Sequence, residues 1–311
     1  MSALKLMQRL PGADFVSNGR HWIIGLPWLW LTLFFLLPFL FVLKISLSEA
    51  ALAQPPYLPF IREIEDGAMT LVVNFGNYML LFEDPLYRTA LINSVEIAAI
   101  STLLALIIGY PMAYAIARAP QAWRLPLLML IILPFWTSFL IRVYAWIGIL
   151  KNNGLINNTL MSLGLIDQPL EILYTPTAIY IGIIYSYLPF VILPLYATLI
   201  RLDDSLLEAA ADLGCRPWKQ FLTITLPLSM PGIIAAAMLV FIPVMGEFVI
   251  PDLLGGPNAL MIGKLMWTEF FNNKDWPLAS ALAAVLLVML IIPFVLWRHY
   301  EQRQEMQGEA R

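Results

Sequence analysis

The sequence predicts an all-α, polytopic membrane protein with six transmembrane helices. Apolar residues make up 60% of the 311 positions and charged residues only 13%, a balance that soluble globular chains do not show. The apolar residues fall into runs of bilayer length, and backbone groups in hydrocarbon must be paired internally, which favours helices. The runs lack the alternation of a membrane-barrel strand. We therefore expect membrane lipid to surround most of the chain.

Six apolar runs are long enough to cross a bilayer. The first is longer than the core of a cleavable signal peptide, which is about 7 to 15 residues, so it indicates a retained span. Prolines inside the runs can bend their helices, and membrane helices generally tolerate them. The expected spans are residues 22–43, 90–117, 125–149, 175–199, 229–250 and 277–297.

The basic residues predict the orientation of these spans. Cytoplasmic loops of membrane proteins carry an excess of Lys and Arg. Six crossings put both termini on one side, and that side holds 11 of the 18 basic residues. We therefore expect a cytoplasmic N-terminal segment over 1–21, a transmembrane domain over 22–297 and a cytoplasmic C-terminal tail over 298–311.

Composition argues against several other functions. The net charge of −3 gives no overall attraction to nucleic acid. Cys215 is the only cysteine, which excludes an internal disulfide and a cysteine metal cluster, and the two histidines lie beside membrane ends. Gly263-Lys264 lacks the flanking residues of a phosphate loop. We expect no catalytic residue, no metal site and no bound cofactor on this chain.

The loop over 201–227, between the fourth and fifth expected spans, predicts two short helices at the cytoplasmic surface. Ser205 and Glu208 have the spacing of a capping box, and Gly214 suits the left-handed position that ends a helix. Pro227 is expected to end the second helix before the fifth span. On geometry alone, such a loop could be a simple connector between spans.

The residues of this loop also follow the spacing E-A-A-x3-G-x9-I-x-L-P. The fixed positions are filled by Glu208, Ala209, Ala210, Gly214, Ile224, Leu226 and Pro227. This pattern resembles the EAA loop of binding-protein-dependent ABC importer permeases. In that family the loop is the coupling helix, which sits in a cleft of the cytoplasmic ATPase and turns nucleotide-driven closure into movement of the spans. The resemblance implies the fold of a type I importer permease.

Further stretches extend the resemblance over nearly all of the chain. They are LPFWTSFLIR at 133–142, KNNGLIN at 151–157, GEFVIP at 246–251 and WTEFF at 267–271. They resemble polyamine importer permeases most closely, the putrescine permeases in particular. The family implies a bacterial inner-membrane complex with four kinds of partner or cargo: a second homologous permease, two copies of an ATPase that uses ATP and Mg²⁺, a periplasmic polyamine-binding protein, and a polyamine such as putrescine or spermidine.

Two other functions stay open at this point. One is a permease of the same ABC class for another small cationic or amino-acid-like solute. The other is an ion-coupled secondary transporter, which would need no loop for an ATPase. The chain shows no convincing internal repeat, which weakens the case for a secondary transporter built from inverted halves.

Two carboxylates lie within the apolar spans, Glu96 in the second and Glu247 near the outer end of the fifth. Ionisable groups are costly in a membrane, which favours a functional role. Aromatic faces attract cations, so we expect a diammonium cargo to pass these carboxylates and a set of nearby rings. The candidate rings are those of Trp136, Tyr144, Tyr185 and Tyr187. The alternative is that Arg142 pairs with one of the glutamates and fixes the helices.

The last outer loop mixes aromatic with acidic residues, namely Trp267, Glu269, Phe270, Phe271, Asp275 and Trp276. An aromatic belt at the membrane boundary is one explanation. Docking of a soluble binding protein is the other, because the interleaved acids are unnecessary in a belt.

Overall fold

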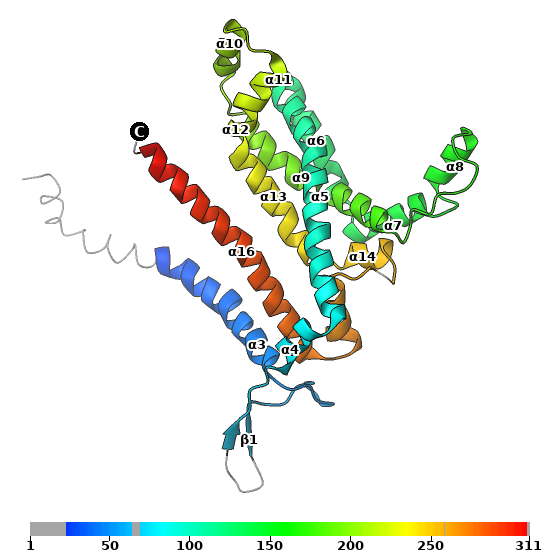
Figure 1. The fold of residues 1–311 in the computed structure, drawn as a ribbon, viewed down its shortest axis with the longest axis vertical. Coiled ribbons are helices and arrows are strands. Elements are labelled where there is room, and N and C mark those ends of the chain that lie inside the picture. Colours follow the sequence, from blue (N-terminus) through cyan, green and yellow to red (C-terminus); the bar gives the residue numbers. More distant parts are fainter. Residues whose placement is uncertain (1–22, 64–68, 258, 310–311) are drawn as a thin grey trace, which may run out of the picture.

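The computed structural model describes residues 23–63, 69–257 and 259–309, and most of them are helical (Figure 1). Residues 1–22, which include the expected N-terminal segment, lie outside the described residues. In chain order the elements are η1 (Thr32–Leu36), α3 (Leu37–Ser46), β1 (Ile61–Glu63), β2 (Met69–Leu71), α4 (Gly76–Glu83), α5 (Pro85–Arg118), α6 (Gln121–Ile132), η2 (Leu133–Trp136), α7 (Phe139–Leu150), α8 (Leu155–Ser162), α9 (Pro176–Leu199), α10 (Asp204–Asp212), α11 (Pro217–Gln220), η3 (Phe221–Thr225), α12 (Leu226–Leu228), α13 (Met230–Met245), α14 (Val249–Leu254), α15 (Ile262–Trp267), η4 (Thr268–Asn272) and α16 (Trp276–Glu309).

The core of the bundle is formed by α5, α9 and α13, which pack on one another. Small side chains on one face of α5 allow the backbones to approach closely, as is common between membrane helices. At Gly109, for example, an added Cβ would lie 2.6 Å from the side chain of Val191 on α9. The buried small residues on this face are Ser94, Ala98, Ser101, Ala105, Gly109, Ala113 and Ala117.

The first and last long helices form a second packed unit. Residues Ile23–Ser46 make one apolar helix that includes η1 and α3, and α3 lies along α16 (Figure 1). The Ser46 and Ser48 carbonyls accept hydrogen bonds from the Asn77 side chain on α4, at 2.8 and 3.0 Å. These bonds hold the end of α3 beside α4, the short helix that precedes α5.

A small antiparallel hairpin interrupts the expected all-helical pattern between α3 and α4. Ile61 pairs with Leu71, and Glu63 pairs with Met69. The two strands have three residues each, too few for a sheet that is stable by itself. The hairpin extends away from the helices in Figure 1.

The third expected span, 125–149, is broken near Pro134, one of the prolines expected to allow a bend. Residues 121–136 and 139–162 form two helical segments that meet at 90°. Thr137 and Ser138 between them have extended backbones, and the Thr137 hydroxyl donates to the Pro134 carbonyl at 2.7 Å. Pro134 cannot donate a backbone hydrogen bond, which weakens the helix where it stops. As a result, α7 and α8 extend sideways from the bundle (Figure 1).

The fifth expected span, 229–250, is correct only to Met245. There α13 ends, and a new helix, α14, starts at Val249. Pro243 lies two residues before the end of α13, and its ring and missing N–H weaken the hydrogen bonding of the turn before it. The last expected span begins as predicted, because α16 starts at Trp276, and this helix continues beyond 297 to Glu309.

Candidate functional site

The first helix of the loop over 201–227 is α10, and an aspartate caps its N-terminus. The Asp203 carboxylate accepts a hydrogen bond from the Ser205 backbone N–H at 3.0 Å. Bonds from the backbone and side chain of Ser205 lower the pKa of the Asp203 carboxyl. The predicted capping box at Ser205 and Glu208 is therefore wrong by two residues. Asp203 precedes Ser205 and is at least as good an N-cap, so the helix starts earlier.

The C-terminus of α10 forms a Schellman motif. Gly214 has φ of +77°, which confirms its predicted left-handed conformation. The Cys215 N–H donates to the Ala210 carbonyl at 2.9 Å, and the Gly214 N–H donates to the Ala211 carbonyl at 2.8 Å. These are the two bonds that define the motif, and they satisfy carbonyls that the end of a helix would leave unpaired. The two fixed residues Ala210 and Gly214 of the EAA pattern thus determine how α10 ends.

The second helical segment of the loop begins as expected and ends at Leu228, one residue after the predicted end at Pro227. Arg216 occupies the N-cap position of α11 without a side-chain capping bond, and Pro217 occupies the first turn. The chain then continues through the π-helical turn η3 into α12, which contains Pro227. Pro227 has no N–H to donate to the preceding turn, and the wider π turn changes the hydrogen bonding there. The break comes after Leu228, where Pro217–Leu228 and Met230–Met245 differ in direction by 66°.

The turn between α10 and α11 is exposed at one end of the molecule (Figure 1). We call residues 203–220 the elbow. Glu208 and Ala209 are exposed, and the Leu213 and Trp218 side chains are 89% and 62% exposed. An uncovered patch of apolar side chains beside polar ones indicates an interaction surface. The fixed residues Ile224 and Leu226 are half-buried below the elbow, and Pro227 is exposed.

At the other end of α13, Glu247 lies in the break before α14 and is buried, with 8% of its surface exposed. Its carboxylate accepts a hydrogen bond from the Tyr187 hydroxyl at 2.7 Å. It also accepts from the backbone N–H groups of Val249 and Ile250, at 3.0 and 3.4 Å. Glu247 therefore acts as the cap of α14 and joins it to α9.

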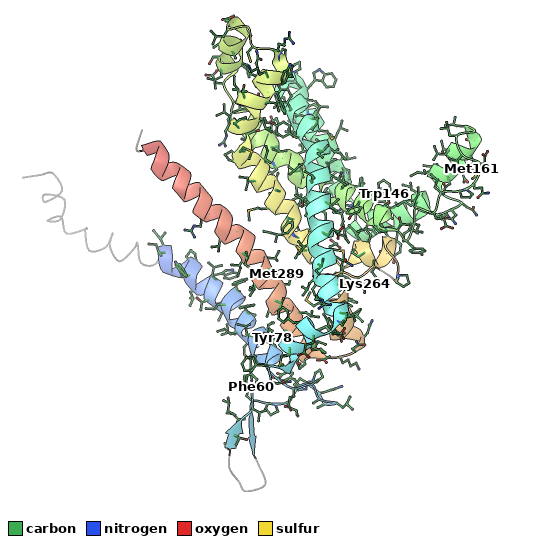
Figure 2. The ribbon with its side chains drawn as sticks, in the orientation of Figure 1. Phe60, Tyr78, Trp146, Met161, Lys264 and Met289 are labelled. Carbon is green, nitrogen blue, oxygen red and sulfur yellow. The ribbon has the colours of Figure 1, made fainter. Side chains whose placement is uncertain are left out.

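The backbone of this break is closely packed by α15. A Cβ added to Gly263 would lie 2.3 Å from the Gly246 carbonyl oxygen and 2.7 Å from that of Glu247. Glycine at position 263 thus allows α15 to touch the backbone of the break. The next residue, Lys264 (labelled in Figure 2), forms an ion pair with Asp252 on α14 at 3.4 Å.

Arg142 does not pair with Glu247 or Glu96 in the described part of the chain. Its guanidinium lies over the Phe135 ring, 4.5 Å from the centroid, and its Nε and Nη1 atoms are buried without a hydrogen-bond partner. The alternative in which Arg142 pairs with a glutamate is therefore not supported, because this residue lies over η2 after the 90° turn before α7. Tyr187 takes the role expected of Arg142.

A row of aromatic rings connects Arg142 with Glu247. Phe135 and Phe190 meet edge to face at 5.5 Å, and Phe190 lies 6.0 Å from Tyr187. Neither Phe135 nor Phe190 was predicted as a site residue, because phenylalanines in an apolar run look like ordinary lipid-facing or core residues.

The remaining predicted pathway residues are more dispersed. Glu96 is exposed on α5, and the Trp136 and Tyr144 side chains are 79% and 57% exposed. Tyr185 packs edge to face on Trp146 of α7, at 5.3 Å (Trp146 is labelled in Figure 2). Among the predicted pathway residues that the structure describes, the direct hydrogen bond is between Tyr187 and Glu247.

The expected last outer loop uses much of its aromatic and acidic content internally. Glu269 is buried and accepts hydrogen bonds from the Tyr87 hydroxyl and the Asn273 amide, both at 2.8 Å. Asp275 caps α16 through the Leu278 N–H at 3.0 Å. Phe270 stacks on Trp276 at 5.0 Å. Beside these rings, residues 50–56 and 270–276 line a hollow of about 920 Å³.

These features describe a membrane transport subunit: an apolar helical bundle with broken helices and an uncovered elbow outside the bundle. In the part of the chain that the structure describes, no group of His, Cys, Asp or Glu residues could hold a metal ion. The chain belongs to the family of binding-protein-dependent transport system inner membrane components, whose model matches residues 22–305.

Relatives of known name support this membership. The chain is 41% identical over 270 residues to the spermidine/putrescine transport system permease protein PotB of Escherichia coli K12, covering 86% of this chain and 93% of the relative. It is 39% identical to PotB of Haemophilus influenzae over 86% of this chain and 90% of the relative. The chain is therefore a multi-pass permease subunit of an ABC transporter and not an enzyme. ATP and Mg²⁺ act through a separate ATPase subunit.

Solved structures show the same fold. A chain of a bacterial ABC transporter that imports the acidic polysaccharide alginate superposes with a TM-score of 0.69 at 17% identity, covering 93% of this chain and 98% of the other. The alginate transporter in complex with its alginate pentasaccharide-bound periplasmic protein gives a TM-score of 0.68, also at 17% identity, covering 94% and 97%. At this identity the likeness concerns the fold alone, and it confirms the predicted type I importer permease architecture.

Proposed function

We propose that this chain is a translocating subunit of an ATP-driven importer that carries spermidine or putrescine into the bacterial cytoplasm. The relatives whose names include these two amines match almost the whole chain, which supports a polyamine as the cargo. Their names do not separate the two amines, so putrescine, the narrower expectation, stays a prediction.

The observation that carries the proposal is the exposed elbow. It places two residues of the EAA pattern, Glu208 on a short, capped helix and Gly214 just after its end, where the rest of the chain leaves them uncovered. A carboxylate and small side chains suit close docking in a basic cleft of a partner. In our proposal, two ATPase subunits receive this elbow and that of a second, homologous permease.

We also propose six crossings with both termini in the cytoplasm. Ile23–Ser46, α5 and α9 are each long and apolar enough to cross. The bent pairs that contain α6 and α13 would supply two more, and the apolar first half of α16, Trp276–Ile292, the sixth. A broken helix in a membrane is tolerated where protein or a water-filled cavity covers its free backbone groups. With this orientation the elbow faces the ATPase.

For the amine path, we propose different roles for the two intramembrane carboxylates. Glu96 is exposed and forms no ion pair among the described residues, so its charge is available to a passing ammonium group. The oxygens of Glu247 already accept three hydrogen bonds. Glu247 therefore shapes the wall of the path, and the exposed rings of Trp136 and Tyr144 offer faces to the cation.

On the outer side, we propose that the periplasmic binding protein docks over residues 50–56 and 270–276. The hollow of about 920 Å³ between these segments is lined by both, so it would accept a projecting loop. Because Glu269 and Asp275 are used internally, backbone and aromatic edges would make most of this contact.

The test is transport by the reconstituted complex. The chain, its companion permease and the ATPase are placed in proteoliposomes with the binding protein and labelled putrescine or spermidine. We expect uptake that requires ATP and the binding protein and that survives a protonophore. Uptake that does not require ATP but is abolished when the proton gradient is removed would establish a secondary transporter instead. Competition by spermidine, putrescine and a cationic amino acid then assigns the cargo.

A further inference from the structure

The elbow is attached to the rest of the chain at two points on the same helix, α5. The first attachment is an ion pair between Arg118, the last residue of α5, and Asp204, the first residue of α10. The Arg118 guanidinium also lies over the Tyr114 ring, 5.6 Å from its centroid. The start of α10 is thus tied directly to the end of α5.

The second attachment is aromatic and lies beyond α11. The Phe221 ring in η3 meets Tyr110 and Tyr114 of α5 edge to face, at 5.5 and 6.3 Å. The Tyr110 hydroxyl and the Ser229 hydroxyl are hydrogen-bonded at 2.8 Å, and both residues are buried. Edge-to-face rings and a buried hydrogen bond are directional, so this contact resists sliding as well as separation.

The connection from the elbow to α13 is different, because it passes through a bend. Ser229 lies between Leu228 and Met230, where the helix direction changes by 66°. Its hydroxyl is within hydrogen-bonding distance of the Leu226 carbonyl at 3.0 Å as well as of Tyr110. Ser229 is therefore fixed to α5 and to the helix before the bend, and α13 begins just after it.

From this arrangement we propose that the contacts of Arg118, Tyr110 and Phe221 make the elbow and the cytoplasmic end of α5 one rigid body, with Ser229 as the pivot to α13. Two attachments on opposite sides of the elbow prevent it from swivelling about either one. A movement of α10 is then delivered first to α5, whose small-residue face passes it to α9. These are positioning residues for coupling, and the inference rests on the proposed docking of the elbow to an ATPase.

The functional test is the number of amines imported per ATP hydrolysed by the whole reconstituted importer. The variants are Tyr110→Phe with Phe221→Leu, which removes the hydroxyl and the ring, and Arg118→Gln, which removes the ion pair. We expect the ratio of uptake to hydrolysis to fall about fivefold in the double variant, with assembly and ATP hydrolysis retained.

The charge-reversed pair Arg118→Asp with Asp204→Arg should recover at least half of the transport ratio that Arg118→Asp alone loses. Arg124→Gln, at the same end of the bundle, is the control and should leave the ratio unchanged.

A distance measurement tests rigidity directly. Cys215 is the only cysteine of the chain and lies in the elbow, so one spin label goes there and a second on Ala119→Cys or on Leu239→Cys of α13. Between the nucleotide-free and the vanadate-trapped importer, we expect the Cys215–Ala119 distance to stay constant and the Cys215–Leu239 distance to change.

Two results would overturn the inference: an unchanged transport ratio in the Tyr110→Phe, Phe221→Leu variant, or a Cys215–Ala119 distance that moves as much as the other. Parallel loss of uptake and hydrolysis would also count against it, since it would show that these residues serve assembly. Failure of the unaltered complex to bind an ATPase or to use ATP would instead contradict the proposed function itself.

Discussion

The elbow at 203–220 and the break at 246–248 lie before and after α13, and both contain a glutamate. At the elbow, Glu208 is exposed beside Leu213, which is 89% exposed. At the break, Glu247 is 8% exposed and accepts hydrogen bonds from Tyr187 and two backbone N–H groups. The difference separates two uses of an acidic residue. A carboxylate that the fold has already satisfied maintains structure, whereas one left uncovered is available to another molecule.

The largest effect should come from the backbone of the elbow. Gly214→Val places a β-branched residue at φ of +77°, where a left-handed backbone costs non-glycine residues about 1–2 kcal/mol. We expect ATP-driven uptake to fall more than about tenfold while the protein level in the membrane stays normal.

The matched control for this variant is Gly164→Val. Gly164 also has a left-handed backbone, with φ of +67°, and neither glycine has another atom within 4 Å of an added Cβ. The two changes therefore impose similar strain in different places. Equal loss of uptake in both variants would show that the elbow has no special role.

Substitutions at the break at 246–248 should act mainly by lowering the stability of the protein. Glu247→Leu leaves the Tyr187 hydroxyl and the N–H groups of Val249 and Ile250 without their acceptor, at a cost of about 1–3 kcal/mol for each buried group. We expect a reduced membrane level and a lower melting temperature. Glu247→Gln keeps an acceptor oxygen, so transport per molecule should remain near normal. A large rise in the amine concentration needed for half-maximal uptake in Glu247→Gln would instead assign Glu247 to the cargo.

Glu96 should behave in the opposite way, because it is exposed and makes no ion pair in the described residues. Glu96→Gln should leave the membrane level and the melting temperature unchanged. It should reduce putrescine uptake about fivefold, because one exposed contact between a carboxylate and an ammonium group contributes about 1 kcal/mol. Binding of the amine to its periplasmic protein is the control. Full uptake by this variant would remove Glu96 from the path.

The smallest effect should come from the cap of α10. Asp203→Ala removes a fully exposed N-cap, and uptake should fall less than about twofold, while Asp203→Asn, also a good cap, should be silent. The pKa of Asp203 is lowered in the folded chain, so its contribution is complete above the ordinary value of 3.8 and is lost only as the pH falls through the lower folded pKa. Lowering the pH to any value above 3.8 should therefore not reduce uptake through loss of this cap. If uptake did depend on pH in that range, and Asp203→Asn abolished the dependence, the expectation would be contradicted.

Much of the fold could be predicted because hydrophobicity and local caps act over short stretches of chain. The apolar runs predicted where Ile23–Ser46, α5 and α9 lie to within a few residues. The left-handed Gly214 was predictable for the same reason, since a helix end depends on a handful of adjacent residues. The prolines near the breaks after Trp136 and Met245 allow a bend, but the sequence did not predict which prolines would break a span, because the neighbouring residues stay apolar and a hydropathy pattern reports only how apolar a run is.

By itself, the sequence determined that the chain spans a membrane and that it carries an EAA-type loop ending in a left-handed glycine. Tertiary structure alone decided what the buried polar groups do. Glu247 and Tyr187 are 60 residues apart, and Tyr110 and Ser229 are 119 apart, yet each pair is hydrogen-bonded. A carboxylate in hydrocarbon must find donors, and which donors lie within reach depends on how the helices pack and bend.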